Sequence, residues 1–175
     1  TSNHLTEWFK TPAPTLDDQN RNISAAVLWA LKGDANQRAI IAWHMGWKPA
    51  LKASGADWMT PYLAEFMDDS YDAVRYIAWH SLNRDGYHDE KKYDFVAPAK
   101  DRRAITSGIR TTWTAANRKP AAHLLIGESG IETNRFNRLL EKRDHRPVKL
   151  VESVDATATG VNSDQSAMDC RASRV

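Results

Sequence analysis

Apolar residues recur at helical spacing through the middle of the chain. Ile23, Val27, Leu28 and Leu31 fall at i, i+4, i+5 and i+8, which places them on one face of a helix. Polar residues fill the positions between them, and Gly33 provides a stop signal. No segment shows the strict apolar–polar alternation of a half-buried strand. The pattern therefore predicts an all-α fold.

Start signals mark the beginnings of later helices. Asp34 and Gln37 have the spacing of a capping box, and Thr60-Pro61 places a capping residue before a proline that the first helical turn accepts. Residues 48–57 are expected to form a turn between helices. Apolar stripes predict helices that contain Ile40 and Trp43, Leu63 and Phe66, Val74 and Ile77, Ile105 and Ile109, and Phe136 and Leu139.

One tetrapeptide occurs twice. The sequence Ile-Ala-Trp-His at 41–44 is repeated unchanged at 77–80, an offset of 36 residues. Apolar positions upstream match as well, for example Val27 with Leu63. A single helical hairpin cannot bury its apolar face alone, so repeats of this length stack on one another. We therefore expect a short α-solenoid of helical hairpins.

The chain divides into three predicted parts. Residues 1–20 are polar and form a lead-in segment, whereas residues 21–152 form the repeat domain of about two and a half hairpins. Residues 153–175 are rich in Ser, Thr, Ala and Asp without periodicity, which predicts a flexible, disordered tail. Because so short an array is unusual for a solenoid, we expect this chain to be the end of a longer protein.

The repeat unit resembles a HEAT repeat. Asp34 with Arg38, and Asp72 with Arg75, are similar to the Asp and Arg that open the second HEAT helix. In that family the Arg reaches an Asp in a neighbouring turn, so the resemblance implies a structural role for these four residues. Trp43, His44, Trp79 and His80 complete the expected set of repeat residues.

A longer set of motifs resembles the HEAT-like C-terminal part of bacterial multihaem c-type cytochrome family proteins. Those proteins carry Cys-x-x-Cys-His haem sites upstream of such repeats, outside the cytoplasm. The resemblance therefore implies a periplasmic or other extracytoplasmic location, with an upstream haem domain as the partner. The matching segments are Lys32 to Ala39, Trp43 to Trp47, Ala53 to Trp58, Asp68 to Arg75 and Arg143 to Val148.

Composition excludes several kinds of chemistry. Cys170 is the only cysteine, so the chain has no intramolecular disulfide, no Cys-x-x-Cys site and no c-type haem attachment motif. No apolar run approaches the roughly 20 residues of a membrane span, and no signal peptide is visible. We expect no cofactor in this chain, although haem belongs to the longer parent that the resemblance implies.

Charge is distributed unevenly behind a net value of +2. Residues 1–99 carry 10 basic and 13 acidic groups, whereas residues 100–149 carry 12 and 5. Any electrostatic partner is therefore expected along residues 100–149, with Arg102, Arg103 and Arg110 as interface candidates. An acidic neighbouring domain and a phosphate backbone both fit this segment.

Histidine and tryptophan supply the remaining candidates. Paired imidazoles at His44 and His80 could bind a metal or haem, but the preferred interpretation is hydrogen bonding at the seam between packed helices. Trp47 and Trp58 flank the turn between repeats, where they could cap the stack or anchor a partner. Core packing is the preferred role of the tryptophans on or beside apolar stripes, namely Trp29, Trp43, Trp79 and Trp113.

These observations predict a non-catalytic helical-repeat scaffold that mediates protein–protein or interdomain contacts. Its expected context is the auxiliary C-terminal part of a multihaem cytochrome c-like electron-transfer protein. The alternative is a HEAT-like nucleic-acid-binding protein that uses residues 100–149. An enzyme would require His44, His80 or the loop Asp85–Asp94 to converge in one cleft.

Overall fold

The computed structural model describes residues 2–10, 15–84, 93–115 and 119–146. Within these ranges the chain is mostly helical, which confirms the predicted all-α class; the predicted tail, 153–175, lies outside them. The helices are α1 (Ser2–Phe9), α2 (Asp18–Asn22), α3 (Ala25–Lys32), α4 (Ala35–Met45), α5 (Lys48–Ser54), α6 (Thr60–Phe66), α7 (Asp72–Arg84), α8 (Ala99–Ala115) and α9 (Thr133–Leu140).

Several elements differ from those expected. The lead-in segment contains α1 and the start of α2, which Asp17 caps by accepting a hydrogen bond from the Asn20 amide. Residues 48–54 form α5 rather than a turn, and Gly55 ends this helix with a positive φ of 74°. After the 3₁₀-helix Ala122–Leu124, two short antiparallel strands, β1 (Ile126–Gly127) and β2 (Gly130–Ile131), precede α9. Strands of two residues are too short to give a period-two signal.

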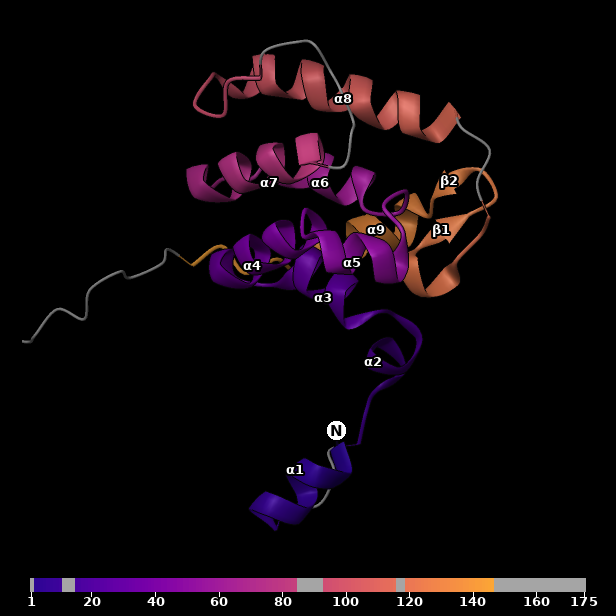
Figure 1. The fold of residues 1–175 in the computed structure, drawn as a ribbon. Coiled ribbons are helices and arrows are strands. Elements are labelled where there is room, and N and C mark those ends of the chain that lie inside the picture. The colour runs from indigo at the N-terminus through magenta and orange to yellow at the C-terminus, as the bar shows by residue number, and fades with distance from the viewer. Residues whose placement is uncertain (1, 11–14, 85–92, 116–118, 147–175) are drawn as a thin grey trace, which may run out of the picture.

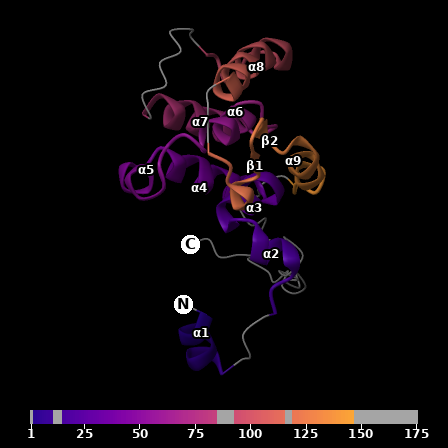
Figure 2. The same cartoon turned by 90° about the vertical axis from the view of Figure 1, so that its right-hand side faces the viewer.

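The helices of the sequence repeat pack as two neighbouring pairs. Helix α3 contacts α4, α6 contacts α7, and α4 lies along α7 (Figure 1). Helix α8 covers α6, and α9 contacts α3 (Figure 2). Helix α1 stands apart from this body in both views. The equivalent second helices of the two repeats, α4 and α7, are therefore direct neighbours.

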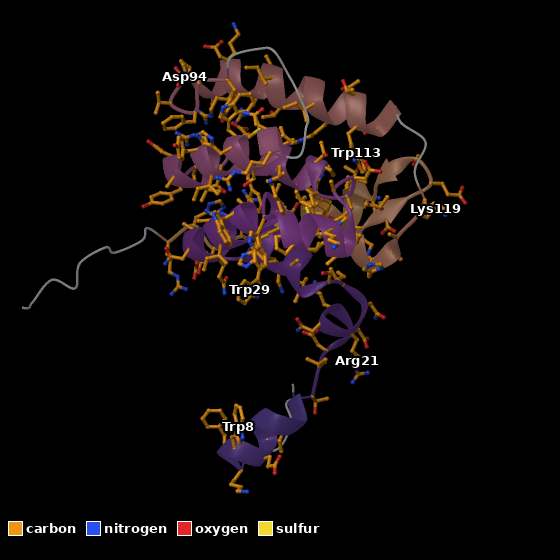
Figure 3. The ribbon with its side chains drawn as sticks, viewed as in Figure 1. Trp8, Arg21, Trp29, Asp94, Trp113 and Lys119 are labelled. Carbon is orange, nitrogen blue, oxygen red and sulfur yellow. The ribbon has the colours of Figure 1, made fainter. Side chains whose placement is uncertain are left out.

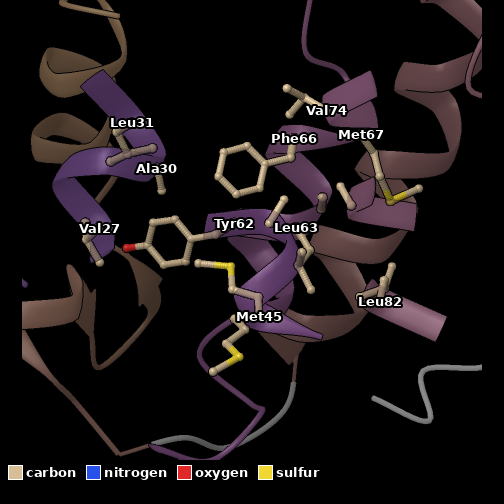
Figure 4. Packing of buried hydrophobic residues seen from close by; sticks show 14 of the residues in the cluster. Val27, Ala30, Leu31, Met45, Tyr62, Leu63, Phe66, Met67, Val74 and Leu82 are labelled. Carbon is tan, nitrogen blue, oxygen red and sulfur yellow. The ribbon is translucent and has the colours of Figure 1, made fainter. Parts of the chain in front are cut away.

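The hydrophobic core lies between the two helix pairs. Helix α6 is at its centre, because Tyr62, Leu63 and Phe66 have no exposed surface. Val27 and Leu31 of α3, two of the residues that the helical pattern placed on one face, also belong to this core (Figure 4). Burying side chains of this size is the main favourable contribution to folding.

Gly46 allows a close approach between the end of α4 and helix α7. A Cβ atom at this position would lie 2.7 Å from Cα of Ser81. Backbone atoms cannot yield as the tip of a flexible side chain can. The distance between the two repeat helices therefore depends on a residue without a side chain.

Candidate interaction surface

Arg38 is enclosed between the two helix pairs and makes a forked contact with Asp69. Its Nε and Nη2 atoms donate to the two carboxylate oxygens of Asp69 at 2.7 and 3.0 Å. Its Nη1 atom donates to the carbonyl oxygens of Gly33, at 2.6 Å, and of Asp144, at 2.9 Å. One guanidinium thus joins the turn before α4, the turn before α7 and the segment after α9.

Arg75 binds the turn before its own helix, α7, as Arg38 binds the turn before α4. Its Nη1 atom donates to the carbonyl oxygen of Asp69 at 2.7 Å, and its Nε atom to that of Phe95. Gly33 and Asp69 are matched by the repeat offset of 36 residues. The two arginines therefore bind equivalent carbonyls, although Arg75 is one position out of register with Arg38.

The two repeat aspartates have separate roles. Asp34 caps α4, because its carboxylate accepts a hydrogen bond from the Gln37 amide at 2.9 Å while the Gln37 side chain accepts from the Asp34 amide. Asp72 lies at the exposed start of α7 and pairs with Arg75 at 2.9 Å. Neither carboxylate links the two repeats; Asp69 forms that link.

Cations from the end of the described chain complete the buried ionic cluster. Arg143 lies 3.4 Å from the Asp69 carboxylate and 3.5 Å from that of Glu65, and it donates to the Leu31 carbonyl oxygen at 3.2 Å. Burial lowers the pKa of the Arg143 guanidinium, and the two carboxylates oppose that shift. Sequence analysis identified neither Glu65 nor Arg143 individually, because contacts across so many residues leave no local pattern.

The three arginines proposed for an interface all pair with acidic residues of this same chain. Arg110 contacts Glu65 at 2.7 Å, while Arg102 and Arg103 contact Asp68 at 3.3 and 2.8 Å. Arg102 is largely buried, so it does not lie on an open surface as expected. The excess positive charge of residues 100–149 is thus partly matched within the chain, by an acidic turn made of Glu65, Asp68 and Asp69.

The two repeat histidines lie at the surface, not at the packed seam. Ala42 and Met45 of α4 turn inward, as do Ala78 and Ser81 of α7, which leaves His44 and His80 facing outward. The His44 ring lies edge-on to those of Trp43 and Trp47, and the His80 ring edge-on to that of Tyr76. Their expected role in the seam is therefore wrong.

Around these histidines lies a set of exposed apolar side chains. Ile40, Trp43 and Trp47 are spaced along one face of α4 and its end, each with close to half of its surface exposed. The Trp43 and Trp47 rings stack with their centroids 6.0 Å apart. We use the name aromatic surface for six residues: Ile40, Trp43, His44, Trp47, Tyr76 and His80. Within this set, Tyr76 and His80 occupy the repeat positions of Ile40 and His44.

The remaining tryptophans divide between surface and core. Trp113 is buried and donates to the Asp57 carbonyl oxygen at 2.6 Å, and Trp79 is partly buried against Tyr93. Trp29 is 45% exposed, and so is Trp43, so the prediction of core packing is wrong for both (Trp29 and Trp113 are labelled in Figure 3). Trp58 is half-buried and meets the Tyr62 ring edge-on.

The described residues contain no group of three or more His, Cys, Asp or Glu side chains that could hold a metal ion. Most of the loop Asp85–Asp94 lies outside them. In the same part of the chain, no helix combines the length and apolar character needed to cross a bilayer.

Comparisons of the chain with protein-family models, with curated proteins and with solved structures gave no match. The aromatic surface and the buried ionic cluster are therefore the features that point to a function.

Proposed function

We propose that this chain is a non-catalytic scaffold, a short α-solenoid of HEAT-like hairpins that binds a protein partner through its aromatic surface. The observation that carries the proposal is the outward position of Trp43 on α4, Trp47 just after its end and Tyr76 on the adjoining helix α7. Tryptophan and tyrosine are the side chains most enriched among the residues that dominate binding energy at interfaces. Exposed apolar groups gathered in this way indicate an interaction site.

The charges at the ends of the two helices favour an acidic partner. Lys48 follows Trp47 directly, and Arg84 lies one helical turn after His80. Both side chains are exposed, and neither forms an ion pair with any residue in the described ranges. The partner is therefore proposed to present an apolar patch beside carboxylates, because complementary charge speeds association and excludes wrong partners.

The resemblance to multihaem c-type cytochrome proteins suggests which partner to test. We propose that it is a haem-bearing domain, joined to this chain or separate from it, outside the cytoplasm. The buried ionic cluster supports a scaffold role, because Arg38, Arg75 and Asp69 hold the two repeats in one arrangement.

The experiment measures binding of this chain to a purified multihaem c-type cytochrome from the same organism. Replacing both Trp43 and Trp47 by Ala is expected to weaken binding by about 30-fold or more, the effect of losing one hot-spot side chain worth 2 kcal/mol. Trp29→Ala is the matched control, because Trp29 is equally exposed but lies on α3. No measurable binding, or equal weakening by the control, contradicts the proposal.

Duplex DNA provides the second arm of this experiment. The alternative, a nucleic-acid-binding protein, predicts tight binding that falls steeply with salt and depends on residues 100–149. Such binding in the absence of any cytochrome complex would replace the proposed function with the alternative.

A further inference from the structure

Some cations of the basic segment have no acidic partner within the described ranges. Of the basic residues described between 100 and 146, six contact carboxylates and four do not; the four are Lys100, Lys119, Arg138 and Lys142. Two of these four line one groove: Arg138 lies on helix α9, and Lys142 lies just after its end. Half of the unmatched cations of this segment therefore line one groove.

The groove lies between α2 and α9 and has a volume of about 370 Å³. Arg135 and Arg138 lie at i and i+3 on α9, and Lys142 follows two residues after the helix ends at Leu140. Gln19 and Asn22 of α2 line the opposite wall with amide groups. The apolar side chains of Ile23 and Leu139, both buried, complete the lining.

Positive charge dominates this groove. Asp18 is the one carboxylate among its lining residues, and its contact with Arg21 is 4.0 Å long. Arg135 contacts Glu132 through Nη1 at 2.9 Å, which leaves its other N–H groups available. Lys32 adds a further cation at the rim, because its Nζ atom donates to Gln19 Oε1 at 2.6 Å.

We propose that this groove binds a compact phosphate-bearing molecule with the charge and size of a diphosphate group. Guanidinium groups present paired N–H donors that match phosphate oxygens, and lysine adds a point charge. The eight residues that line the groove all fall within 18–23 and 135–142, so the positive charge of the groove is local. A nucleic acid would need a continuous track of free cations, whereas Arg102, Arg103 and Arg110 on α8 contact carboxylates.

The test titrates the full chain with inorganic pyrophosphate at constant ionic strength, followed by calorimetry and by amide chemical shifts. Saturable binding is expected, with amide shifts confined to residues 18–23 and 135–142. The double substitution Arg138→Gln and Lys142→Gln is expected to weaken binding at least tenfold. Lys100→Gln with Lys119→Gln is the matched control, because it removes two equally unpaired cations outside the groove and should leave the affinity unchanged.

Three outcomes overturn the proposal: no saturable binding, equal loss in the control variant, or amide shifts outside residues 18–23 and 135–142. A short DNA duplex is titrated in parallel. Tighter binding of the duplex, lost in the Arg138 and Lys142 variant, would assign the groove to nucleic acid instead. Neither side chain contacts the aromatic surface or the buried cluster, so this result is independent of the test with a cytochrome.

Discussion

At the scale of single residues, Asp69 is the most constrained group in the described structure. Its side chain has no exposed surface and accepts hydrogen bonds from Arg38 and from the Tyr71 amide, with Arg143 close by. A buried carboxylate is tolerated only when such partners replace its hydration. Removing the carboxylate would leave buried Arg38 without its acidic partner and would leave Arg143 with Glu65 alone.

We therefore expect Asp69→Ala to lower the free energy of unfolding by about 3–5 kcal/mol, the cost of breaking a buried ion pair. Urea denaturation followed by tryptophan fluorescence measures this change. Asp72→Ala is the control, because Asp72 is largely exposed and its pair with Arg75 should contribute less than about 1 kcal/mol. Equal effects of the two substitutions would show that Asp69 does not organise the cluster.

The sequence allowed only part of this cluster to be predicted. The likeness of Asp34, Arg38 and Arg75 to repeat residues pointed to a tie between turns, but Asp69 was included only within the matching segment Asp68 to Arg75. Arg143 opened the matching segment Arg143 to Val148 and belonged to the basic segment 100–149, whose charge was interpreted as a surface for another molecule. A net charge does not reveal which cations are buried, because burial depends on packing between distant segments.

At the scale of elements, capping residues and apolar spacing predicted where helices begin better than they predicted which helix faces are exposed. The capping pair Asp34–Gln37 begins α4 as expected. The outward position of Trp43 was not predicted, because a tryptophan beside an apolar stripe has the same spacing whether it faces the core or the solvent. Helix α5 was also missed, since its seven residues give too short a pattern.

Replacing either of two glycines by alanine should change the stability of the protein, with opposite signs at the two positions. Gly46→Ala is expected to destabilise the protein by about 1–3 kcal/mol, because the new methyl group would collide with the Ser81 backbone. Gly108→Ala, inside α8 with open space around the position, is expected to stabilise it by up to about 1 kcal/mol. Thermal or urea unfolding of the two variants measures the change in the free energy of unfolding for each. A neutral Gly46→Ala variant would contradict the close α4–α7 contact.

At the scale of the whole molecule, two tyrosine hydroxyls connect distant segments. Tyr62 of α6 donates to the Leu124 carbonyl oxygen, and Tyr93 donates to that of Met67. Burial raises the pKa of both phenols, that of Tyr93 to about 12. A phenolate has no proton to donate, so each of these hydrogen bonds would be lost if its tyrosine ionised. The contacts between these distant segments therefore depend on the protonation of the two tyrosines.

Stability should therefore fall in alkaline solution. Because the folded-state pKa exceeds the ordinary value of 10.0, the folded chain keeps a proton that the unfolded chain releases. The resulting contribution is complete below pH 10 and is lost as the pH rises towards 12. The urea concentration at the midpoint of unfolding, measured as a function of pH, tests this prediction. The Tyr93→Phe variant should lose less stability than the unmodified chain over the same pH range. Tyr76→Phe, an exposed ring of the aromatic surface, should not change this loss.

The contacts of Arg143 also have a consequence for how the protein is made. This side chain meets Leu31, Glu65 and Asp69, residues that leave the ribosome long before it does. Both helix pairs of the repeat can form during synthesis, but the acidic turn between them receives its last counter-charge only when residue 143 emerges. Folding of the body is therefore completed only after residue 143 has been translated, and a ribosome that stalls before this codon would hold a chain with a partly uncompensated interior.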